Sequence, residues 1–252
     1  MQQYFIEGDD YDADHLVITG TDVHHIKNVM RMKITDKIRI VSQHIVYLGE
    51  ITAISADAIS VKKIKQLDEN RELKQHITIA LGLLKQDKFE YALQKMTELG
   101  MHTCIPWQAK LSVVKLYDKK AQKKQLRWQL IAKEAAEQSR RSHIPKIEQA
   151  KTSLQLTELF SQYDVVYIAY EDLAYESAPL HFSKDDVAIL VIIGPEGGIA
   201  QSELAQLLAT KHNNIQLISL GKRILRAETA AIYTMSILSA AIEQNIIVGA
   251  ND

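Results

Sequence analysis

Two hydrophobic runs constrain the fold of this chain more than any other feature. Residues 164–170 read Asp-Val-Val-Tyr-Ile-Ala-Tyr, and residues 187–193 read Val-Ala-Ile-Leu-Val-Ile-Ile. Runs this continuous are typical of strands that are buried on both faces, as in parallel sheets covered by helices. Apolar runs at 77–84, 103–106 and 215–220 are separated by helical patterns. We therefore expect a parallel α/β domain with right-handed crossovers.

Glycine turns follow two of these runs. The segment 194–198 reads Gly-Pro-Glu-Gly-Gly, and Gly221 directly follows the run that ends at Leu220. Because parallel strands end at a common edge, we expect both turns to border one ligand pocket. Neither turn matches a phosphate-binding motif, and Pro195 and Glu196 remove a backbone donor and add an anion. A cofactor without phosphates, such as S-adenosylmethionine, fits better; a plain tight turn is the alternative interpretation.

Residues 1–70 have a different pattern, which predicts a small β-barrel. Polar and apolar residues alternate at 37–41, 46–54 and 58–64, and one helix is expected at 22–30. The polar stretch 66–74 is the expected linker. Residues 1–70 carry eight Lys and Arg against eleven Asp and Glu. RNA binding here would therefore need a local patch such as Lys27, Arg31 and Lys33, and a solvated helix end explains the same residues.

The positive charge of the chain is concentrated in residues 110–146. This segment holds eleven Lys and Arg against three acidic residues, whereas the whole chain has a net charge of -1. A helix over 119–139 would present the charge as a stripe, with Leu126, Leu130 and Ile131 facing inward. Contact with nucleic-acid phosphates and a merely solvated face are both open interpretations.

The glycine turn 193–198, followed by Leu-Gly-Lys-Arg-Ile-Leu-Arg-Ala-Glu-Thr-Ala at 220–230, resembles the RsmE family of the SPOUT class, bacterial 16S ribosomal RNA uracil-N3 methyltransferases. The segments 85–100, 135–141 and 29–33 resemble further parts of that family in the same order. The resemblance covers nearly the whole chain, and its C-terminal pair of motifs is specific.

This resemblance implies a PUA-like N-terminal barrel (residues 1–70) and a C-terminal α/β methyltransferase domain (residues 75–252) with a trefoil knot. It also implies a homodimer and a 16S ribosomal RNA substrate in the small ribosomal subunit. The expected S-adenosylmethionine-binding residues are Ile193, Gly194, Pro195, Glu196, Gly197, Gly198, Ile218, Leu220, Gly221, Ile224, Leu225, Arg226 and Thr229. The expected RNA-binding residues are Arg31, Lys33, Lys123, Lys124, Arg140 and Arg141.

The sequence departs from the family pattern at three places. Thr35-Asp36 stands where the family usually has Gly-Asp, and Ser42-Gln43-His44 stands where it often has an Asp-Gly turn. Ala200 replaces the usual Ser or Thr at a helix N-cap, which costs about 1 kcal/mol relative to a capped helix. None of these departures touches the cofactor motifs.

Two residues are candidates for the chemistry of methyl transfer. Uracil N3 becomes a nucleophile when its proton leaves, and negative charge then spreads onto the ring oxygens. Arg226 is the expected cation that stabilises this charge, unless it pairs with Glu228 or Glu196 in a structural role. Glu137 is the candidate general base, and a helix cap or a pair with Arg140 or Arg141 is its alternative.

Several classes of protein are disfavoured by the sequence. The single cysteine, Cys104, excludes an internal disulfide, and no signal peptide or membrane-length apolar run is present, so we expect a cytoplasmic protein. His24 and His25 have no partner at metal-ligand spacing, so no metal is expected. Two rival functions stay open: methylation of another RNA such as transfer RNA, and a non-catalytic RNA-binding assembly factor.

Overall fold

The computed structural model describes residues 1–6, 14–85, 87–170 and 187–244. The chain divides into two compact units. The first unit consists of Met1–Glu72 and Ala136–His143, and the second consists of Leu73–Ala135 and Ile144–Asp252. The sequence predicts a single boundary between the units at residues 70–75. It does not predict that residues 136–143 also belong to the first unit.

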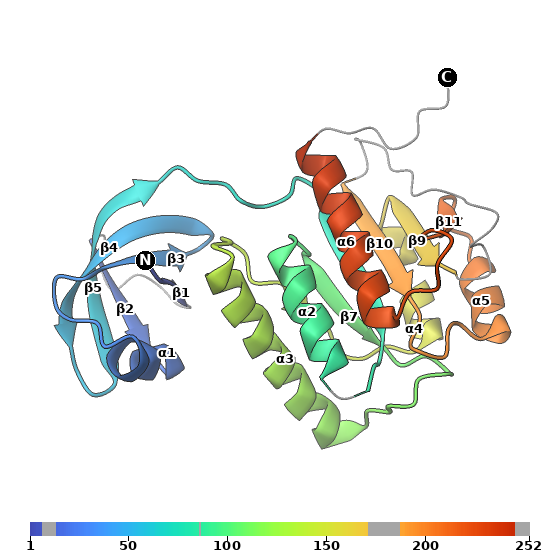
Figure 1. Ribbon diagram of the computed structural model, residues 1–252, viewed down its shortest axis with the longest axis horizontal. Coiled ribbons are helices and arrows are strands. Elements are labelled where there is room, and N and C mark those ends of the chain that lie inside the picture. Colours follow the sequence, from blue (N-terminus) through green and yellow to red (C-terminus); the bar gives the residue numbers. More distant parts are fainter. Residues whose placement is uncertain (7–13, 86, 171–186, 245–252) are drawn as a thin grey trace. The chain divides into compact units, whose positions relative to one another are not determined.

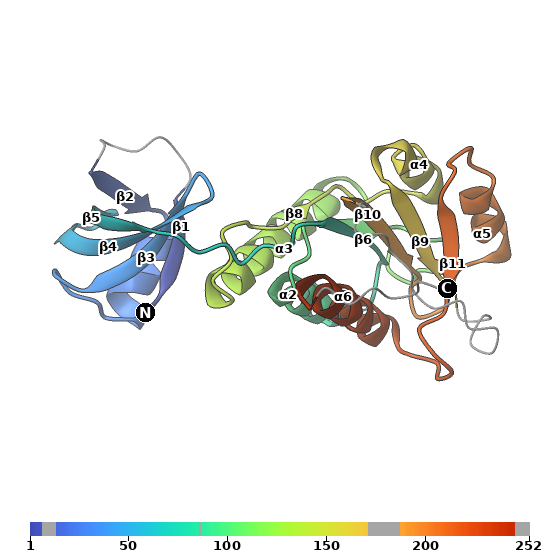
Figure 2. The ribbon, with the colours of Figure 1, turned by 90° about the horizontal axis from the view of Figure 1, so that it is seen from above.

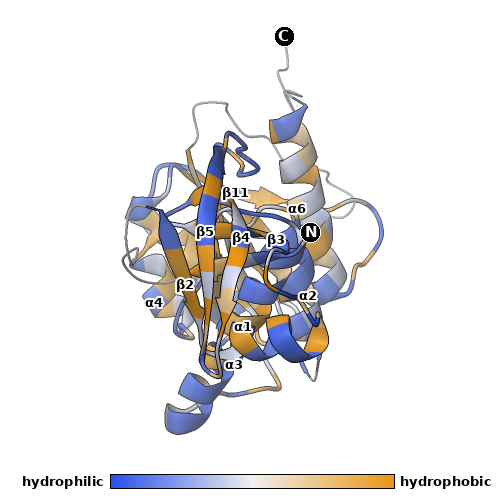
Figure 3. Ribbon diagram, turned by 90° about the vertical axis from the view of Figure 1, so that its left-hand side faces the viewer, coloured by the Kyte–Doolittle hydropathy of each residue, from blue (hydrophilic) through white to orange (hydrophobic). Residues whose placement is uncertain are grey.

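The first unit is built on a five-stranded sheet. Its strands are β1 (Gln3–Ile6), β2 (His15–Thr19), β3 (Lys37–Ser42), β4 (Ile45–Ile54) and β5 (Ala58–Leu67), in the order β1-β3-β4-β5-β2. β1 is parallel to β3, and the other pairs are antiparallel. Hydrophobic and hydrophilic residues alternate along β4 and β5 (Figure 3). Most apolar residues of the strands form one common core, which contains Leu16, Ile40 and Ile59, whereas Ile45 and Ile64 are exposed.

A short helical segment closes the core of the first unit. It consists of α1 (Thr21–His24) and the π-helical turn η1 (His25–Val29), in agreement with the predicted helix. Val23 and Ile26 are buried against the sheet residues. In the π-turn the N–H of Met30 donates to the carbonyl of His25 at 2.9 Å. The chain then leaves the segment through Arg31, which has a positive φ of 51°.

Thr35 occupies a backbone conformation that normally requires glycine. Its φ is 80°, which is a genuine outlier for a β-branched residue. Thr35 is exposed, and its N–H donates to the carbonyl of Ile51 at 2.8 Å, which fixes the turn. We predict that Thr35→Gly raises the free energy of unfolding of the first unit by about 1 kcal/mol. Relief of the left-handed strain exceeds the entropy that glycine adds to the unfolded chain.

Hydrogen exchange of the amides in β3 and β4 measures this effect. Thr19→Gly is the matched control, because Thr19 is also exposed but ends a regular strand. That control should destabilise the unit. Equal destabilisation by both glycines would contradict the assignment of strain to Thr35.

The second unit contains a six-stranded sheet. Its strands are β6 (His76–Gly82), β7 (Thr103–Trp107), β8 (Lys146–Ile147), β9 (Val165–Ala169), β10 (Ala188–Ile193) and β11 (Ile215–Ile218), in the order β11-β9-β10-β6-β7-β8. All of the neighbouring pairs are parallel, so the predicted parallel sheet is confirmed. The two longest hydrophobic runs became β9 and β10, which lie inside the sheet.

Helices cover both faces of this sheet. They are α2 (Lys88–Glu98), α3 (Asp118–Gln138), α4 (Ser153–Thr157), α5 (Gln201–Leu208) and α6 (Ala227–Glu243), with the 3-10 turn η2 (Phe160–Gln162). α2 and α6 lie on one face, and α4 and α5 lie on the other (Figures 1 and 2). Alternate residues of β10 therefore enter two separate cores, which explains the continuous hydrophobic run. No helix of the described residues is long and apolar enough to cross a membrane.

The inward face of α3 differs from the prediction. Leu126 and Leu130 are 73% and 44% exposed, whereas Trp128 is buried. Trp128 packs against Phe89 of α2 with ring centroids 4.3 Å apart, and this contact turns its face of α3 toward the core. A residue two positions away points about 200° around the helix, so Leu126 and Leu130 face outward. The prediction that these two leucines face inward is therefore wrong.

Candidate functional site

The carboxyl ends of β9, β10 and β11 meet at one edge of the second sheet. Ala169 is the register partner of both Ile193 in β10 and Ile218 in β11. Leu81 of β6 pairs with Ile193 on the other side. The loops that follow these strands therefore start at the same height, which places the two glycine turns on either side of β9.

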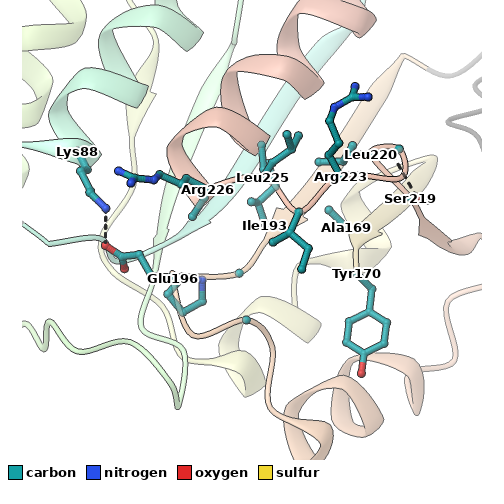
Figure 4. A pocket seen from close by; sticks show the side chains of 17 residues that line it. Lys88, Ala169, Tyr170, Ile193, Glu196, Ser219, Leu220, Arg223, Leu225 and Arg226 are labelled. Atoms are coloured by element: carbon teal, nitrogen blue, oxygen red, sulfur yellow. Dashed lines mark hydrogen bonds and ion pairs between the residues drawn. The ribbon is translucent and has the colours of Figure 1, made fainter. Parts of the chain in front are cut away.

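A pocket of about 460 Å³ lies at this edge (Figure 4). This volume is ordinary for a site that binds one small molecule. Its lining residues come from the ends of β9 and β10, the two glycine loops and the starts of α2 and α6. They are Lys88, Ala169, Tyr170, Ile193, Gly194, Pro195, Glu196, Gly198, Ser219, Leu220, Gly221, Arg223, Ile224, Leu225, Arg226, Ala227 and Ala230.

Most of the residues expected to bind the cofactor are brought together here. Those that line the pocket are Ile193, Gly194, Pro195, Glu196, Gly198, Leu220, Gly221, Ile224, Leu225 and Arg226. The other three lie outside its lining. Ile218 is buried in the core, Gly197 packs against Leu111, and Thr229 is exposed in the first turn of α6.

Gly82 allows the first glycine loop to lie directly against the end of β6. A Cβ atom at Gly82 would stand 2.3 Å from the backbone nitrogen of Pro195 and 2.8 Å from the carbonyl carbon of Gly194. Both neighbours are backbone atoms, which cannot rotate away. Glycine inside a strand marks such a close approach.

We predict that Gly82→Ala weakens S-adenosylmethionine binding and lowers the free energy of unfolding of the second unit by about 1–3 kcal/mol, as other overpacked sites do. Calorimetric titration and tryptophan-monitored unfolding measure the two effects, since Trp107 and Trp128 both belong to this unit. Gly221→Ala is the control, because a Cβ there meets nothing within 4 Å and only its positive φ opposes the change. A larger loss of stability in the control would refute the steric argument.

Lys88 organises the charges on one side of the pocket. Its Nζ lies 3.6 Å from Oε1 of Glu196 and 3.6 Å from Oε1 of Glu228. Glu196 also accepts a hydrogen bond from the N–H of Lys85 at 3.2 Å. Oε2 of Glu228 is buried and has no hydrogen-bond partner among the described residues. Lys88 was not singled out from the sequence, because its two partners lie far away along the chain.

Arg226 stands beside this cluster at the N-cap position of α6. Figure 4 shows its guanidinium pointing to the same side of the pocket as Lys88 and Glu196. No hydrogen bond or ion pair of the Arg226 side chain is found within the part of the chain that the structure describes. The carboxylates that would have paired it structurally, Glu196 and Glu228, face Lys88 instead.

Glu203 anchors a neighbouring loop to the start of α5. Ala200 is the N-cap of this helix and provides no side-chain cap, as predicted. The carboxylate of Glu203 is buried and accepts hydrogen bonds from the N–H of Lys110, at 2.9 Å, and from the hydroxyl of Ser153. A negative charge in the first turn of a helix is favoured by the helix dipole. The anchored loop carries Leu111, which covers Gly197.

Glu137 does not line the pocket. It belongs to the first unit, where its Oε1 accepts a hydrogen bond from the N–H of Phe5 at 3.4 Å. Burial, together with the charges of Glu137 and Asp22, raises the pKa of Tyr4 well above its usual range. These interactions agree with the structural alternative for Glu137, and its assignment as general base stays a prediction.

The expected RNA-binding residues fall into two groups. Arg31, Lys33, Lys123 and Arg140 are exposed. Lys124 is half-buried, lies 3.7 Å from Glu90 and stands over the ring of Trp128. Arg141 is a correction: it is only 3% exposed, and its guanidinium is held by Glu72 at 2.6 Å, so it does not present its charge to a phosphate.

The pocket fits S-adenosylmethionine in chemistry as well as in size. Leu220, Ile224 and Leu225 supply apolar walls, and the glycines expose backbone groups at close range. Glu196 places a carboxylate at the same site. Among the described residues, no group of three or more His, Cys, Asp and Glu side chains could hold a metal ion.

Comparisons with known proteins agree with this arrangement. An RNA methyltransferase domain model matches residues 71–239, and an RNA methyltransferase PUA domain model matches residues 18–64. The chain is 42% identical to ribosomal RNA small subunit methyltransferase E of Bacillus subtilis, over 96% of this chain and 98% of that protein. It is 32% identical to the protein of the same name from Mesomycoplasma hyopneumoniae, over 94% and 98% of the two chains. A Legionella pneumophila structure in complex with S-adenosylmethionine superposes with a TM-score of 0.83, at 26% identity, covering 95% of this chain and 97% of that one.

A parallel sheet with a cofactor pocket at its edge, joined to a PUA domain, defines an S-adenosylmethionine-dependent RNA methyltransferase. Within that class, the chain belongs to the ribosomal RNA small subunit methyltransferase E family.

Proposed function

We propose that this protein methylates N3 of one uridine of 16S ribosomal RNA in the small ribosomal subunit. The observation that carries the proposal is Arg226, which lies beside a glycine-lined pocket and whose side chain pairs with none of the residues that the structure describes. The relatives at 42% and 32% identity, which are named for small-subunit ribosomal RNA, support the substrate. Uracil N3 lies on the Watson–Crick edge, so the target base must be unpaired or splayed out when it reaches the pocket.

Arg226 is the residue that we assign to the chemical step. When bound, the cofactor supplies a methyl group that is activated by its positive sulfonium. As the uracil loses its N3 proton, negative charge spreads onto the two ring oxygens. A guanidinium held near those oxygens stabilises this charge more strongly in the transition state than in the ground state. With cofactor and uracil bound, the pocket would hold the methyl group and N3 in line at close range, which would remove much of the entropic barrier.

The exposed basic residues of both units are proposed to hold the RNA. Arg31, Lys33, Lys123 and Arg140 are free to meet phosphates, and each such contact adds affinity and orientation rather than choice of sequence. The outward position of Leu126 and Leu130 on α3 adds an apolar surface beside Lys123. Binding is therefore expected to weaken steeply as salt concentration rises.

The proposal includes the assembly that the family resemblance implies. The active protein is a cytoplasmic homodimer, and the segment that contains β10, β11 and the two glycine loops forms a trefoil knot at the subunit interface. Ile224 is 87% exposed and Tyr233 is exposed on α6, as expected of apolar side chains that a second subunit covers. Light scattering of the purified protein tests the dimer.

Methylation of small ribosomal subunits from cells that lack this activity tests the function. The subunits are incubated with the protein and labelled S-adenosylmethionine, and the modified base is mapped. Label at a single N3-methyluridine is the expected result. Absence of label with intact cofactor binding would transfer the activity to another RNA, such as transfer RNA. Absence of both would leave a non-catalytic RNA-binding assembly factor.

A further inference from the structure

Three charged side chains on one side of the pocket, and a fourth next to them, form a cluster. Lys88 from the first turn of α2, Glu196 from the first glycine loop and Arg226 from the N-cap of α6 line the pocket, and Glu228 from the first turn of α6 pairs with Lys88. Lys88 lies 3.6 Å from one oxygen of each glutamate. The cluster thus contains two cations and two carboxylates, but the described residues use one cation for both carboxylates.

The pairing of both carboxylates with Lys88 is not the arrangement that the usual preference of a carboxylate for arginine predicts. A guanidinium binds a carboxylate through two parallel hydrogen bonds and is the more usual partner in partly buried ion pairs, whereas an ammonium acts as a point charge. The Glu228 side chain is only 13% exposed, and its Oε2 has no partner among the described residues. Arg226 precedes Glu228 by two residues, and Figure 4 shows it directed to the side of the pocket that holds Glu196. If the ammonium of Lys88 were removed, the guanidinium of Arg226 would therefore take its place beside the two carboxylates.

We propose that Lys88 is a positioning residue that keeps Arg226 available. Lys88 neutralises Glu196 and Glu228 together. These two carboxylates therefore do not bind the guanidinium of Arg226. Arg226 then stays free to face a bound molecule that carries developing negative charge. The use of that free guanidinium in methyl transfer rests on the proposed function, but its availability is a property of the protein alone.

The reaction of Arg226 with phenylglyoxal tests the proposal without measuring activity. Phenylglyoxal modifies accessible guanidinium groups, and mass spectrometry of the peptide that contains Arg226 gives the rate. We expect Lys88→Met to slow labelling of Arg226 several-fold, because the guanidinium now binds the two glutamates. The turnover of ribosomal RNA methylation should fall by about tenfold or more, with a smaller change in the affinity for S-adenosylmethionine.

Two further variants separate positioning from misfolding. Lys88→Arg retains the cation and should keep the wild-type labelling rate of Arg226. The triple variant Lys88→Met, Glu196→Gln, Glu228→Gln lacks the competing carboxylates and should restore the labelling rate. Lys95→Met is the matched control on the same helix, because the ion pair of Lys95 within the described ranges is with Glu98, three residues along α2. It should alter neither labelling nor turnover.

Wild-type labelling of Arg226 in Lys88→Met would overturn the proposal, as would slow labelling that persists in the triple variant. Failure of the proposed function gives a different pattern. If Arg226→Ala methylates normally while the labelling of Arg226 in the other variants depends on Lys88 as expected, the positioning stands and the catalytic assignment of Arg226 falls.

Discussion

Arg226→Ala is expected to lower the turnover of methyl transfer by about 10²–10³-fold, the usual loss when one group that stabilises transition-state charge is removed. The affinity for S-adenosylmethionine should be retained, because apolar side chains and backbone groups form most of the pocket. Single-turnover methylation of small ribosomal subunits and calorimetric titration of the cofactor measure the two quantities. A loss confined to the chemical step separates transition-state stabilisation from uniform binding.

Arg223→Ala is the matched control for this prediction. Arg223 lines the same pocket and is exposed, yet Figure 4 shows its side chain directed away from Lys88 and Glu196. Its removal should weaken RNA binding at most, in a way that salt concentration modulates. Equal losses of turnover from Arg223→Ala and Arg226→Ala would mean that the loop contributes general positive charge, and Arg226 would lose its place in the mechanism.

The sequence predicts this site to the extent that local pattern determines it. A strand that ends in glycine predicts a turn, and two such strands in a parallel sheet predict turns at a shared edge. The pocket lining from Ile193 to Gly198 and from Leu220 to Arg226 could therefore be predicted from the sequence. The roles of Gly82 and Lys88 could not. Their importance comes from contacts with residues more than 100 positions away, such as the ion pair between Lys88 and Glu196 and the approach of Gly82 to Pro195. Such contacts depend on strand order, which alternation and turn signals leave undetermined.

The orientation of α3 was predicted wrongly for the same reason. The sequence shows its basic and apolar residues, but the buried face is determined by the packing of Trp128 against Phe89 of another helix. A glycine at position 82 inside an apolar run was the one available signal for close backbone approach, since glycine otherwise weakens a strand. The sequence contains no comparable signal that separates Arg140 from Arg141. They are neighbours of the same type, yet Arg140 is exposed and Arg141 is buried.

Glu72→Ala is expected to destabilise the first unit by about 3–5 kcal/mol, the usual cost of removing one partner from a buried ion pair. Arg141 is almost fully buried and donates to Oε2 of Glu72 from Nε at 3.0 Å and from Nη2 at 2.6 Å. Oε1 of the same carboxylate accepts from the N–H groups of Ser142 and His143. Without Glu72, the guanidinium and two backbone donors lose their acceptor together, and residues 136–143 should detach from the unit.

Hydrogen exchange in β3 to β5 reports this loss. Glu98→Ala is the control, because the Lys95–Glu98 pair lies on the surface of the other unit and should contribute less than about 1 kcal/mol.

The pH dependence of stability is a second test of the Glu72–Arg141 pair. Burial alone would raise the pKa of Glu72, but the hydrogen bonds and charge of Arg141, with the N–H groups of Ser142 and His143, outweigh burial and lower it. A lowered carboxyl pKa stabilises the fold above the unfolded value of about 4.3, and this contribution is lost as pH falls through the folded value. The difference between the wild-type protein and Glu72→Ala should therefore be full at neutral pH and shrink below about pH 4. A difference that stays constant into acid would mean that the carboxylate charge does not hold Arg141 in place.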